Sequence, residues 1–390
     1  MPPYRLSDRE KAMLVQLVQD LVRIPSVSAD DVTGCPEAGV ADYLETYFRR
    51  LDMDVQRIVM PPNRPNLLAS WPQDHADDRK RLVLTVHMDT VEPDGMTIDP
   101  FAADVRDGRI WGRGTCDTKG ALAAYLWVLS KVRELKLELP WKLEFLAVCD
   151  EETGCTGSRW LVDQGVSADY MIVGEPTGCR IATCHRGRVM FKIITEGIAA
   201  HASVPDRGVN AVYRMNDAIN VLRQKWLPTL GRPRHEQLGS TTSSLTLVRG
   251  GRRDNIVPDR CQAVFDTRTI PGHDQRQFLE TIRSLISTVD GASVDVIKSR
   301  SPLDTDSASP LVQGLLQTCR TLREDDAPAA LPYLTDASNF AETGAHCVVF
   351  GPGGIDKAHS ADEYLEIDQL HRSAEILLAF LLDLADGRHR

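Results

Sequence analysis

The stretch Leu82-Val83-Leu84-Thr85-Val86, followed directly by His87-Met88-Asp89, decides the fold. Five nearly continuous apolar residues match the length of a strand, and the missing polar alternation is typical of a strand buried on both faces. Similar runs occur at 143–148 and 170–173, and a helical pattern at 119–135 lies between the runs 82–86 and 143–148. Strands that alternate with helices predict an α/β fold, with helices on both faces of a central sheet.

Beyond the strands of this central sheet, the order of helical and strand-like patterns along the chain predicts one domain inserted into another. The pattern changes near residue 181, and helix–strand alternation resumes after residue 301. We therefore expect a discontinuous α/β domain over 1–182 and 301–390, and a compact α+β domain over 183–300. The remaining predicted helices are 7–24, 38–51, 211–222, 275–286, 311–322 and 367–384, and the remaining predicted strands are 109–112, 188–196, 242–248, 263–268 and 347–350.

Composition excludes several classes of protein. The chain has 390 residues, 42% hydrophobic and 26% charged, which is typical of a globular protein rather than a disordered one. A net charge of −10 argues against a nucleic-acid-binding surface. The chain has no apolar run of 18 residues and no apolar signal core at its N-terminus, so we expect no membrane span. Nine cysteines without regular spacing favour reduced thiols and a cytoplasmic protein.

Motifs of common enzyme classes are missing. The segment Gly112–Asp117 begins like a dinucleotide-binding fingerprint, but Asp117 stands where the third glycine belongs. The sequence has no phosphate-binding P-loop and no G-x-S-x-G nucleophile elbow, and His235-Glu236 lacks the second histidine of a zinc-protease helix. A nucleotide-binding protein or a serine hydrolase is therefore not expected.

Acids and histidines instead collect at the ends of predicted strands, where ligands bind in open α/β sheets. Asp89 is two residues from His87, on the same face of extended chain, and can orient its imidazole. Two histidines and three carboxylates suit divalent ions such as Zn, Co or Mn, and they suffice for two ions if one carboxylate bridges. The candidate residues are His87, Asp117, the pair Glu151-Glu152, Glu175 and His359.

These motifs resemble the M20 family of metallopeptidases, and in particular its acetylornithine deacetylase, succinyl-diaminopimelate desuccinylase and glutamate carboxypeptidase branches. The likeness covers nearly the whole chain, inserted domain included. It rests on His87-x-Asp89-Thr90-Val91, the Gly112–Gly120 turn, Glu151-Glu152-Thr153-Gly154, Gly174-Glu175-Pro176-Thr177 and Ala358-His359. It implies a di-metal catalytic domain with a mixed central sheet and an inserted lid and dimerisation domain.

The resemblance also implies roles at the metals. Asp117 would bridge two ions, most simply Zn, with Co or Mn as alternatives. One ion would be held by His87 and Glu175, and the other by Glu152 and His359. Glu151 matches the general base that takes a proton from the metal-bridging water, and Asp89 matches the carboxylate behind His87.

In the inserted domain, the resemblance points to a histidine and to residues that hold a substrate carboxylate. His201 would stabilise the oxyanion, and similar enzymes often supply this histidine across a dimer interface. Arg268 and Asn255 would bind the carboxylate, since a guanidinium binds it bidentately. Arg186 and Thr335 are further candidates for the pocket.

The leading hypothesis is a di-metal amidohydrolase that cleaves the amide bond of an N-acyl amino acid, and acts as a homodimer. One alternative is a dipeptidase or carboxypeptidase on the same scaffold. Another is a non-catalytic relative that keeps the fold for binding, although intact ligand positions and Glu151 argue against it. No nucleic-acid or membrane partner is expected.

Overall fold

The computed structural model describes residues 4–28, 34–72 and 78–388. The chain divides into two compact units. Unit 1 comprises Met1–Thr183, Thr305–Ala329 and Thr335–Arg390, and unit 2 comprises Cys184–Asp304 and Ala330–Leu334. The sequence placed the inserted domain at 183–300. The added segment 330–334 belongs to unit 2 because it joins the strand that begins this unit, with Arg186 N donating to Leu331 O (3.2 Å).

A mixed sheet forms the centre of unit 1, in the strand order β1-β2-β6-β3-β7-β17. Strands β6, β3, β7 and β17 run parallel to one another, whereas β2 is antiparallel to β6. The parallel strands are almost fully buried, as their continuous apolar sequences predict. The bounds are β1 (Asp54–Met60), β2 (Arg64–Ser70), β3 (Arg81–His87), β6 (Lys142–Val148), β7 (Tyr170–Val173) and β17 (His346–Val349).

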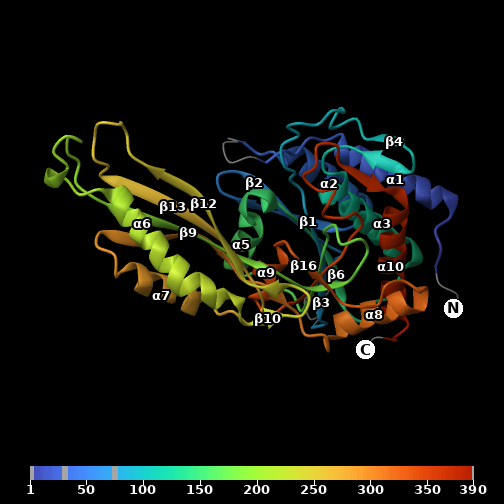
Figure 1. The fold of residues 1–390 in the computed structure, drawn as a ribbon. Coiled ribbons are helices and arrows are strands. Elements are labelled where there is room, and N and C mark those ends of the chain that lie inside the picture. The colour runs from blue at the N-terminus through green and yellow to red at the C-terminus, as the bar shows by residue number, and fades with distance from the viewer. Residues whose placement is uncertain (1–3, 29–33, 73–77, 389–390) are drawn as a thin grey trace. The chain divides into compact units, whose positions relative to one another are not determined.

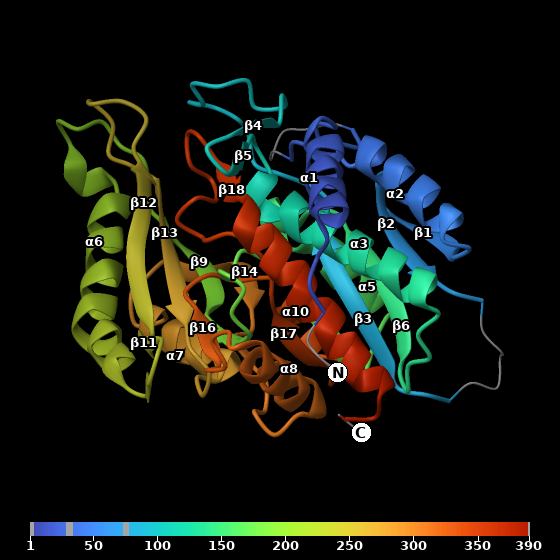
Figure 2. The same ribbon diagram turned by 90° about the vertical axis from the view of Figure 1, so that its right-hand side faces the viewer.

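Helices cover both faces of this sheet, which confirms the predicted fold class. Helices α3 and α10 pack side by side on one face, while α5 and α9 lie on the opposite side (Figures 1 and 2). Helix α1 begins with a capping box between Ser7 and Glu10. The helices are α1 (Asp8–Val22), α2 (Ala38–Arg50), α3 (Gly120–Leu135), α4 (Glu151–Gly154), α5 (Thr156–Asp163), α8 (Pro310–Leu322), α9 (Ala337–Ala341) and α10 (Ile367–Ala385).

Shorter elements complete unit 1 and its boundary with unit 2. A small antiparallel sheet has the order β18-β5-β4. The segment η1 (Thr115–Lys119) joins it to α3. The bounds are β4 (Asp104–Arg106), β5 (Arg109–Trp111), β18 (Tyr364–Glu366), and, where the chain passes between the units, β8 (Ala182–His185), β15 (Leu303–Asp304) and β16 (Ala329–Leu331).

Unit 2 is an antiparallel sheet with two helices, in the order β12-β13-β9-β14. Its core is built around a stacked pair, Phe191 and Phe265, with Trp226 against their edges. Within the described ranges of the chain, no helix is long and apolar enough to cross a membrane. The elements are β9 (Gly187–Glu196), η2 (Pro205–Arg207), α6 (Ala211–Val221), η3 (Leu222–Trp226), η4 (Leu227–Gly231), β10 (Arg234–His235), β11 (Gly239–Ser240), β12 (Thr242–Gly250), β13 (Arg260–Thr269), α7 (Gln275–Ile286) and β14 (Ala292–Arg300).

Candidate metal centre

The site lies at the carboxyl ends of the parallel strands of unit 1. His87 is the last residue of β3, and Glu175 follows β7. Glu151 and Glu152 begin the short helix α4 just after β6, and Asp117 lies in η1. His359 comes from the loop between β17 and β18. Parallel strands end at one edge of their sheet, so residues far apart in sequence meet there.

Asp117 lies between the two histidines. Its Oδ1 is 3.1 Å from Nε2 of His87, and its Oδ2 is 3.3 Å from Nε2 of His359. Glu175 Oε1 lies 3.9 Å from the His87 nitrogen, and Glu152 Oε2 lies 3.0 Å from the His359 nitrogen. The structure therefore brings all five candidate ligands close together around Asp117, while their roles as ligands of particular ions stay predictions.

Burial makes this cluster electrostatically unusual. Burial and the neighbouring Asp117 raise the pKa of Glu152 to about 7, and burial raises the pKa of Glu175 well above its usual value. Burial also opposes ionisation of Asp117, yet contacts with His359 and His87 hold the pKa of Asp117 below its usual value. Several carboxylates that share one dry site repel one another, and a bound cation relieves such repulsion.

The donor set fits divalent metal ions. His87, Asp117 and Glu152 each offer a ligand atom, and these atoms all lie within 4.8 Å of one another. The second oxygen of Glu152, Oε1, is buried and has no hydrogen-bond partner among the described residues. Imidazole and carboxylate donors without a thiolate suit Zn, Co or Mn. The residues present thus fit two such ions, with Asp117 shared between them.

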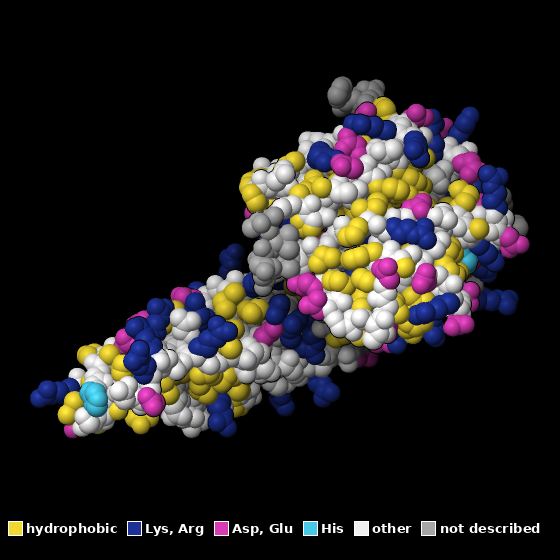
Figure 3. All heavy atoms as spheres, turned by 90° about the horizontal axis from the view of Figure 1, so that it is seen from above, with side chains coloured by type: hydrophobic (Ala, Val, Ile, Leu, Met, Phe, Trp, Pro, Cys, Tyr) yellow, Lys and Arg dark blue, Asp and Glu magenta, His cyan; other side chains and the backbone are white. Residues whose placement is uncertain are grey.

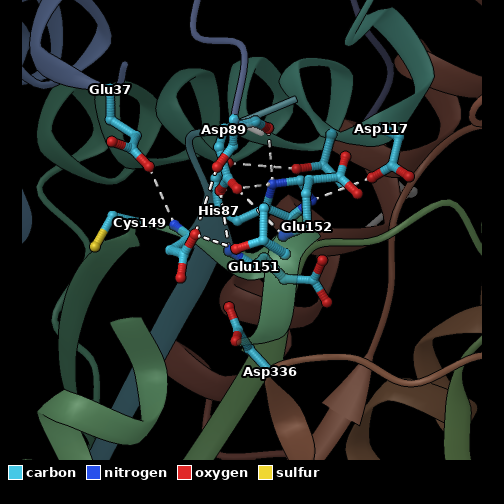
Figure 4. Close-up of polar contacts among 12 residues, drawn as sticks. Glu37, His87, Asp89, Asp117, Cys149, Glu151, Glu152 and Asp336 are labelled. Carbon is cyan, nitrogen blue, oxygen red and sulfur yellow. Dashed lines mark hydrogen bonds and ion pairs between the residues drawn. The ribbon is translucent and has the colours of Figure 1, made fainter. Parts of the chain in front are cut away.

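Asp89 lies directly behind His87 and contacts more than this one residue. His87 Nδ1 lies 2.9 Å from the backbone carbonyl oxygen of Asp89 and 3.6 Å from its carboxylate Oδ1. The Asp89 carboxylate also accepts hydrogen bonds from the backbone N–H groups of Glu151 (3.1 Å) and Glu152 (3.2 Å). Figure 4 shows these residues converging at the start of α4. Asp89 therefore contacts His87 through its carbonyl oxygen and its carboxylate, and the Glu151-Glu152 pair through its carboxylate.

Glu151 lies beside the cluster in a setting suited to proton transfer. Burial raises the pKa of Glu151 well above its usual value. The Cys155 thiol lies 3.4 Å from its Oε1, and Figure 4 shows Asp336 on the side facing Glu151. A raised pKa means that the Glu151 carboxylate binds a proton more readily than a free carboxylate does.

Sequence reasoning missed a buried network behind Glu151. Arg64 Nε lies 3.1 Å from Glu37 Oε1, its Nη1 contacts Asp150, and its Nη2 donates to Ser28 Oγ (2.8 Å). Glu37 also accepts from the backbone N–H of Asp150 (3.1 Å), as Figure 4 shows in part. Asp150 has a φ of +58°, so this network holds a left-handed residue directly before the Glu151-Glu152 pair.

Sequence reasoning also missed Glu363. It is fully buried and touches the η1 loop that carries Asp117. The only hint was its place in the acid-containing loop after His359.

His201, Asn255, Arg186 and Arg268 belong to unit 2, where Ala202 N donates to Asn255 O (3.0 Å) and brings the His201 and Asn255 loops together. His201 is exposed, and its Nδ1 lies 2.7 Å from Ser203 Oγ.

The two arginines and Thr335 have local partners. Arg268 Nε lies 3.1 Å from Asp266 Oδ1, and Arg186 Nη1 donates to the carbonyl of Ser240 (3.0 Å). Thr335, in unit 1, is fully buried, and its hydroxyl accepts from Ala337 N (3.2 Å). These contacts explain how the side chains are held, while their substrate roles stay predictions.

Comparisons with known proteins agree with this geometry. A sequence model of peptidase family M20/M25/M40 matches residues 83–383. An acetylornithine deacetylase from Myxococcus xanthus is 31% identical over 319 residues, covering 80% of this chain and 82% of that protein. A probable succinyl-diaminopimelate desuccinylase from Staphylococcus epidermidis is 28% identical, covering 93% of this chain and 95% of that protein.

Solved structures share the fold. A Staphylococcus aureus tripeptidase superposes with a TM-score of 0.76 at 23% identity, covering 96% of this chain and 99% of that one. An M20 family metallo-carboxypeptidase from Sulfolobus solfataricus superposes with a TM-score of 0.79 at 18% identity, covering 97% and 100%. A Bacillus subtilis structure, TM-score 0.69 at 15% identity and covering 97% and 99%, is described as a dinuclear metal-binding peptidase of the M20 family.

An α/β sheet with a histidine and carboxylate cluster at its strand ends defines a hydrolase of the metallopeptidase and amidohydrolase class. The chain belongs to peptidase family M20/M25/M40. The family predicted from the sequence is thereby confirmed.

Proposed function

We propose that this protein hydrolyses the amide bond of an N-acyl amino acid in a metal-dependent reaction, with Glu151 as general base. The observation that carries the proposal is the position of Asp117, one oxygen facing His87 and the other His359, with Glu151 next to Glu152. The names of two relatives, a deacetylase and a probable desuccinylase, support the substrate class.

Five residues would hold two divalent ions, Zn in the simplest case: His87 and Glu175 on one side, Glu152 and His359 on the other, and Asp117 between them. When bound, such ions polarise the amide carbonyl and make water more acidic. Glu151 would then accept the proton of the attacking water and pass it to the leaving amine. The Asp89 carboxylate would hold Glu151 in position by accepting a hydrogen bond from the backbone N–H of Glu151.

Four residues of unit 2, and Thr335 of unit 1, would supply the contacts to substrate. Arg268 and Asn255 would bind the free carboxylate, with Arg186 and Thr335 as further pocket candidates, and His201 would donate to the developing oxyanion. Residues 184–304 carry more Lys and Arg than Asp and Glu, although the whole chain has 45 against 55. Figure 3 shows many of these basic side chains on the surface of unit 2. An anionic substrate suits this charge.

We also propose that the protein forms a homodimer through unit 2. Strand β12 is an edge of its sheet, and most of its residues are exposed. Leu245, Leu247 and Val248 on it are 39%, 40% and 49% exposed. An exposed apolar edge strand is a surface that a second copy can pair with. Light scattering would test this, and Leu247→Lys should shift a dimer towards monomer.

A dipeptidase or carboxypeptidase is the second candidate, since solved structures of this fold include a tripeptidase and a metallo-carboxypeptidase. A panel of N-acetyl and N-succinyl amino acids beside dipeptides and tripeptides, assayed after reconstitution with Zn, Co or Mn, decides between them. Preference for the acylated amino acids supports the first proposal. Preference for peptides with a free amine supports the second. No turnover of any member with two ions bound would contradict both.

A further inference from the structure

Glu363 is a fully buried carboxylate that collects four hydrogen bonds from one loop. Its Oε1 accepts from the backbone N–H groups of Cys116 (2.7 Å) and Asp117 (3.0 Å). Its Oε2 accepts from the backbone N–H of Gly114 (2.9 Å) and from Nη1 of Arg113 (2.7 Å). Both oxygens are therefore saturated by donors, as burial of a carboxylate requires.

Main-chain contacts strengthen the same connection. Gly112 N donates to the carbonyl of Glu363 (3.0 Å), so the residue holds this loop by its backbone as well. Arg113 reaches on to the carbonyl oxygens of Glu92 (Nε, 3.2 Å) and Ser360 (Nη2, 3.4 Å). The Arg113–Glu363 pair thus connects the Gly112–Asp117 loop to the loop that carries His359.

Only an acceptor with two free oxygens satisfies this arrangement. A glutamine has the same size, but its NH₂ group would face either two backbone N–H donors or Gly114 N together with Arg113. An aspartate keeps the charge but is one CH₂ shorter, so it cannot reach every donor at these distances. Either change would let the Asp117 backbone shift, while most of the core stays untouched.

We propose that Glu363 is a positioning residue for the metal centre, one that fixes Asp117 relative to His359 before a cation binds. The proposal rests on the ligand roles of Asp117 and His359 set out above. A ligand held in advance loses less freedom on binding, and partners behind metal ligands commonly contribute roughly 10–100-fold in metal affinity. Glu363 touches neither substrate nor ion and acts through the Asp117 backbone.

The first test compares metal binding by wild type, Glu363→Gln and Glu363→Asp, using calorimetric titration of the metal-free proteins with Zn or Co alone. Glu144→Gln is the matched control, because Glu144 is also buried and paired, with Arg81 Nε at 2.8 Å, but belongs to β6. Both Glu363 variants should bind at least one ion about tenfold more weakly or worse. The control should bind as wild type does.

Kinetics at saturating metal should show KM within a few-fold of wild type for both variants. Folded Glu363 variants whose metal affinities equal those of wild type would overturn the proposal. A wild type that binds no divalent metal would instead contradict the proposed metal centre, so the two failures are distinguishable.

A second measurement covers the case in which a variant does not fold. In metal-free wild type, hydrogen exchange should find the amides of Cys116 and Asp117 strongly protected, since Glu363 accepts both. The amide of Arg253, in a loop of exposed residues in unit 2, serves as the fast-exchanging reference. Rapid exchange of the Cys116 and Asp117 amides without metal would contradict the proposal that Glu363 fixes this loop before a cation binds.

Discussion

The Asp89 carboxylate accepts a hydrogen bond from the backbone N–H of Glu151, Oδ1 to N at 3.1 Å. The same carboxylate accepts a hydrogen bond from Glu152 N. The main-chain carbonyl oxygen of Asp89 lies 2.9 Å from His87 Nδ1. One residue at the end of β3 therefore contacts both a candidate metal ligand and the candidate general base. A carboxylate at this position also matches the partial positive charge of a helix N-terminus.

Asp89→Asn should lower kcat more than metal affinity. The amide can accept from one of the two N–H groups, but its NH₂ then opposes the other, and Glu151 shifts. The contact from His87 to the main-chain carbonyl survives the change. We expect a loss of about 10–100-fold in kcat with both metal sites still filled. Steady-state kinetics and metal analysis would check this, and unchanged kcat would remove Asp89 from the positioning of Glu151.

Removal of divalent metal should abolish hydrolysis. The cluster offers imidazole and carboxylate donors that suit Zn, Co or Mn, and Glu152 Oε1 has no protein partner among the described residues. Dialysis against a chelator should bring activity to background, and stoichiometric Zn, Co or Mn should restore it. A dialysed sample with magnesium alone serves as the control. Full activity in a protein shown to be metal-free would contradict the proposal.

Glu151→Gln should leave the metals in place and remove most of the turnover. General-base catalysis contributes about 10²–10⁴-fold, and an amide cannot accept the proton. Glu152→Gln is the matched variant one residue away, and it should lower the occupancy of one metal because Glu152 Oε2 faces His359 at 3.0 Å. Near-normal kcat in Glu151→Gln with two ions bound would assign the base elsewhere.

The buried parallel strands and the residues at their ends were predictable, because an apolar run has a local signature and parallel strands end together. Strand β1 was not predictable, because it is an edge strand whose residues are mostly exposed and its sequence has little apolar pattern. Strand β14 was missed too, although its burial alternates with period two.

The missed site residues have a different cause. Glu363 and Glu37 are buried acids whose partners lie far away in sequence, and nothing beside them marks them as buried. A carboxylate in a charged loop is usually exposed. Only the fold shows that Glu363 faces backbone N–H groups near Asp117.

The interactions of Glu10 should make the free energy of unfolding smaller in acid than at neutral pH. Burial opposes ionisation, but hydrogen bonds from Tyr4 and Ser7 and the contact with Lys131 (3.0 Å) lower the pKa of Glu10 to about 2. The folded-state pKa lies below the ordinary value, so this stabilisation is present above about pH 4.5 and disappears as pH falls towards 2. Glu10→Gln should lose about 1 kcal/mol at pH 7, because the pair is partly exposed, and little at pH 2. Equilibrium unfolding at both pH values would test this, and an equal loss at both would contradict it.

His201→Ala should depress kcat by about 10²–10³-fold, the usual cost of losing an oxyanion donor, while metal content stays unchanged. His235→Ala, another histidine of unit 2, is the control and should be near wild type. If a dimer partner supplies His201, mixing His201→Ala with inactive Glu151→Gln subunits should restore activity, since one site of each mixed dimer then has both residues. An equal mixture has half its dimers mixed, so recovery should approach about a quarter of wild-type activity. No recovery after verified subunit exchange would place the action of His201 within its own chain. A normal kcat for His201→Ala would remove this residue from the mechanism.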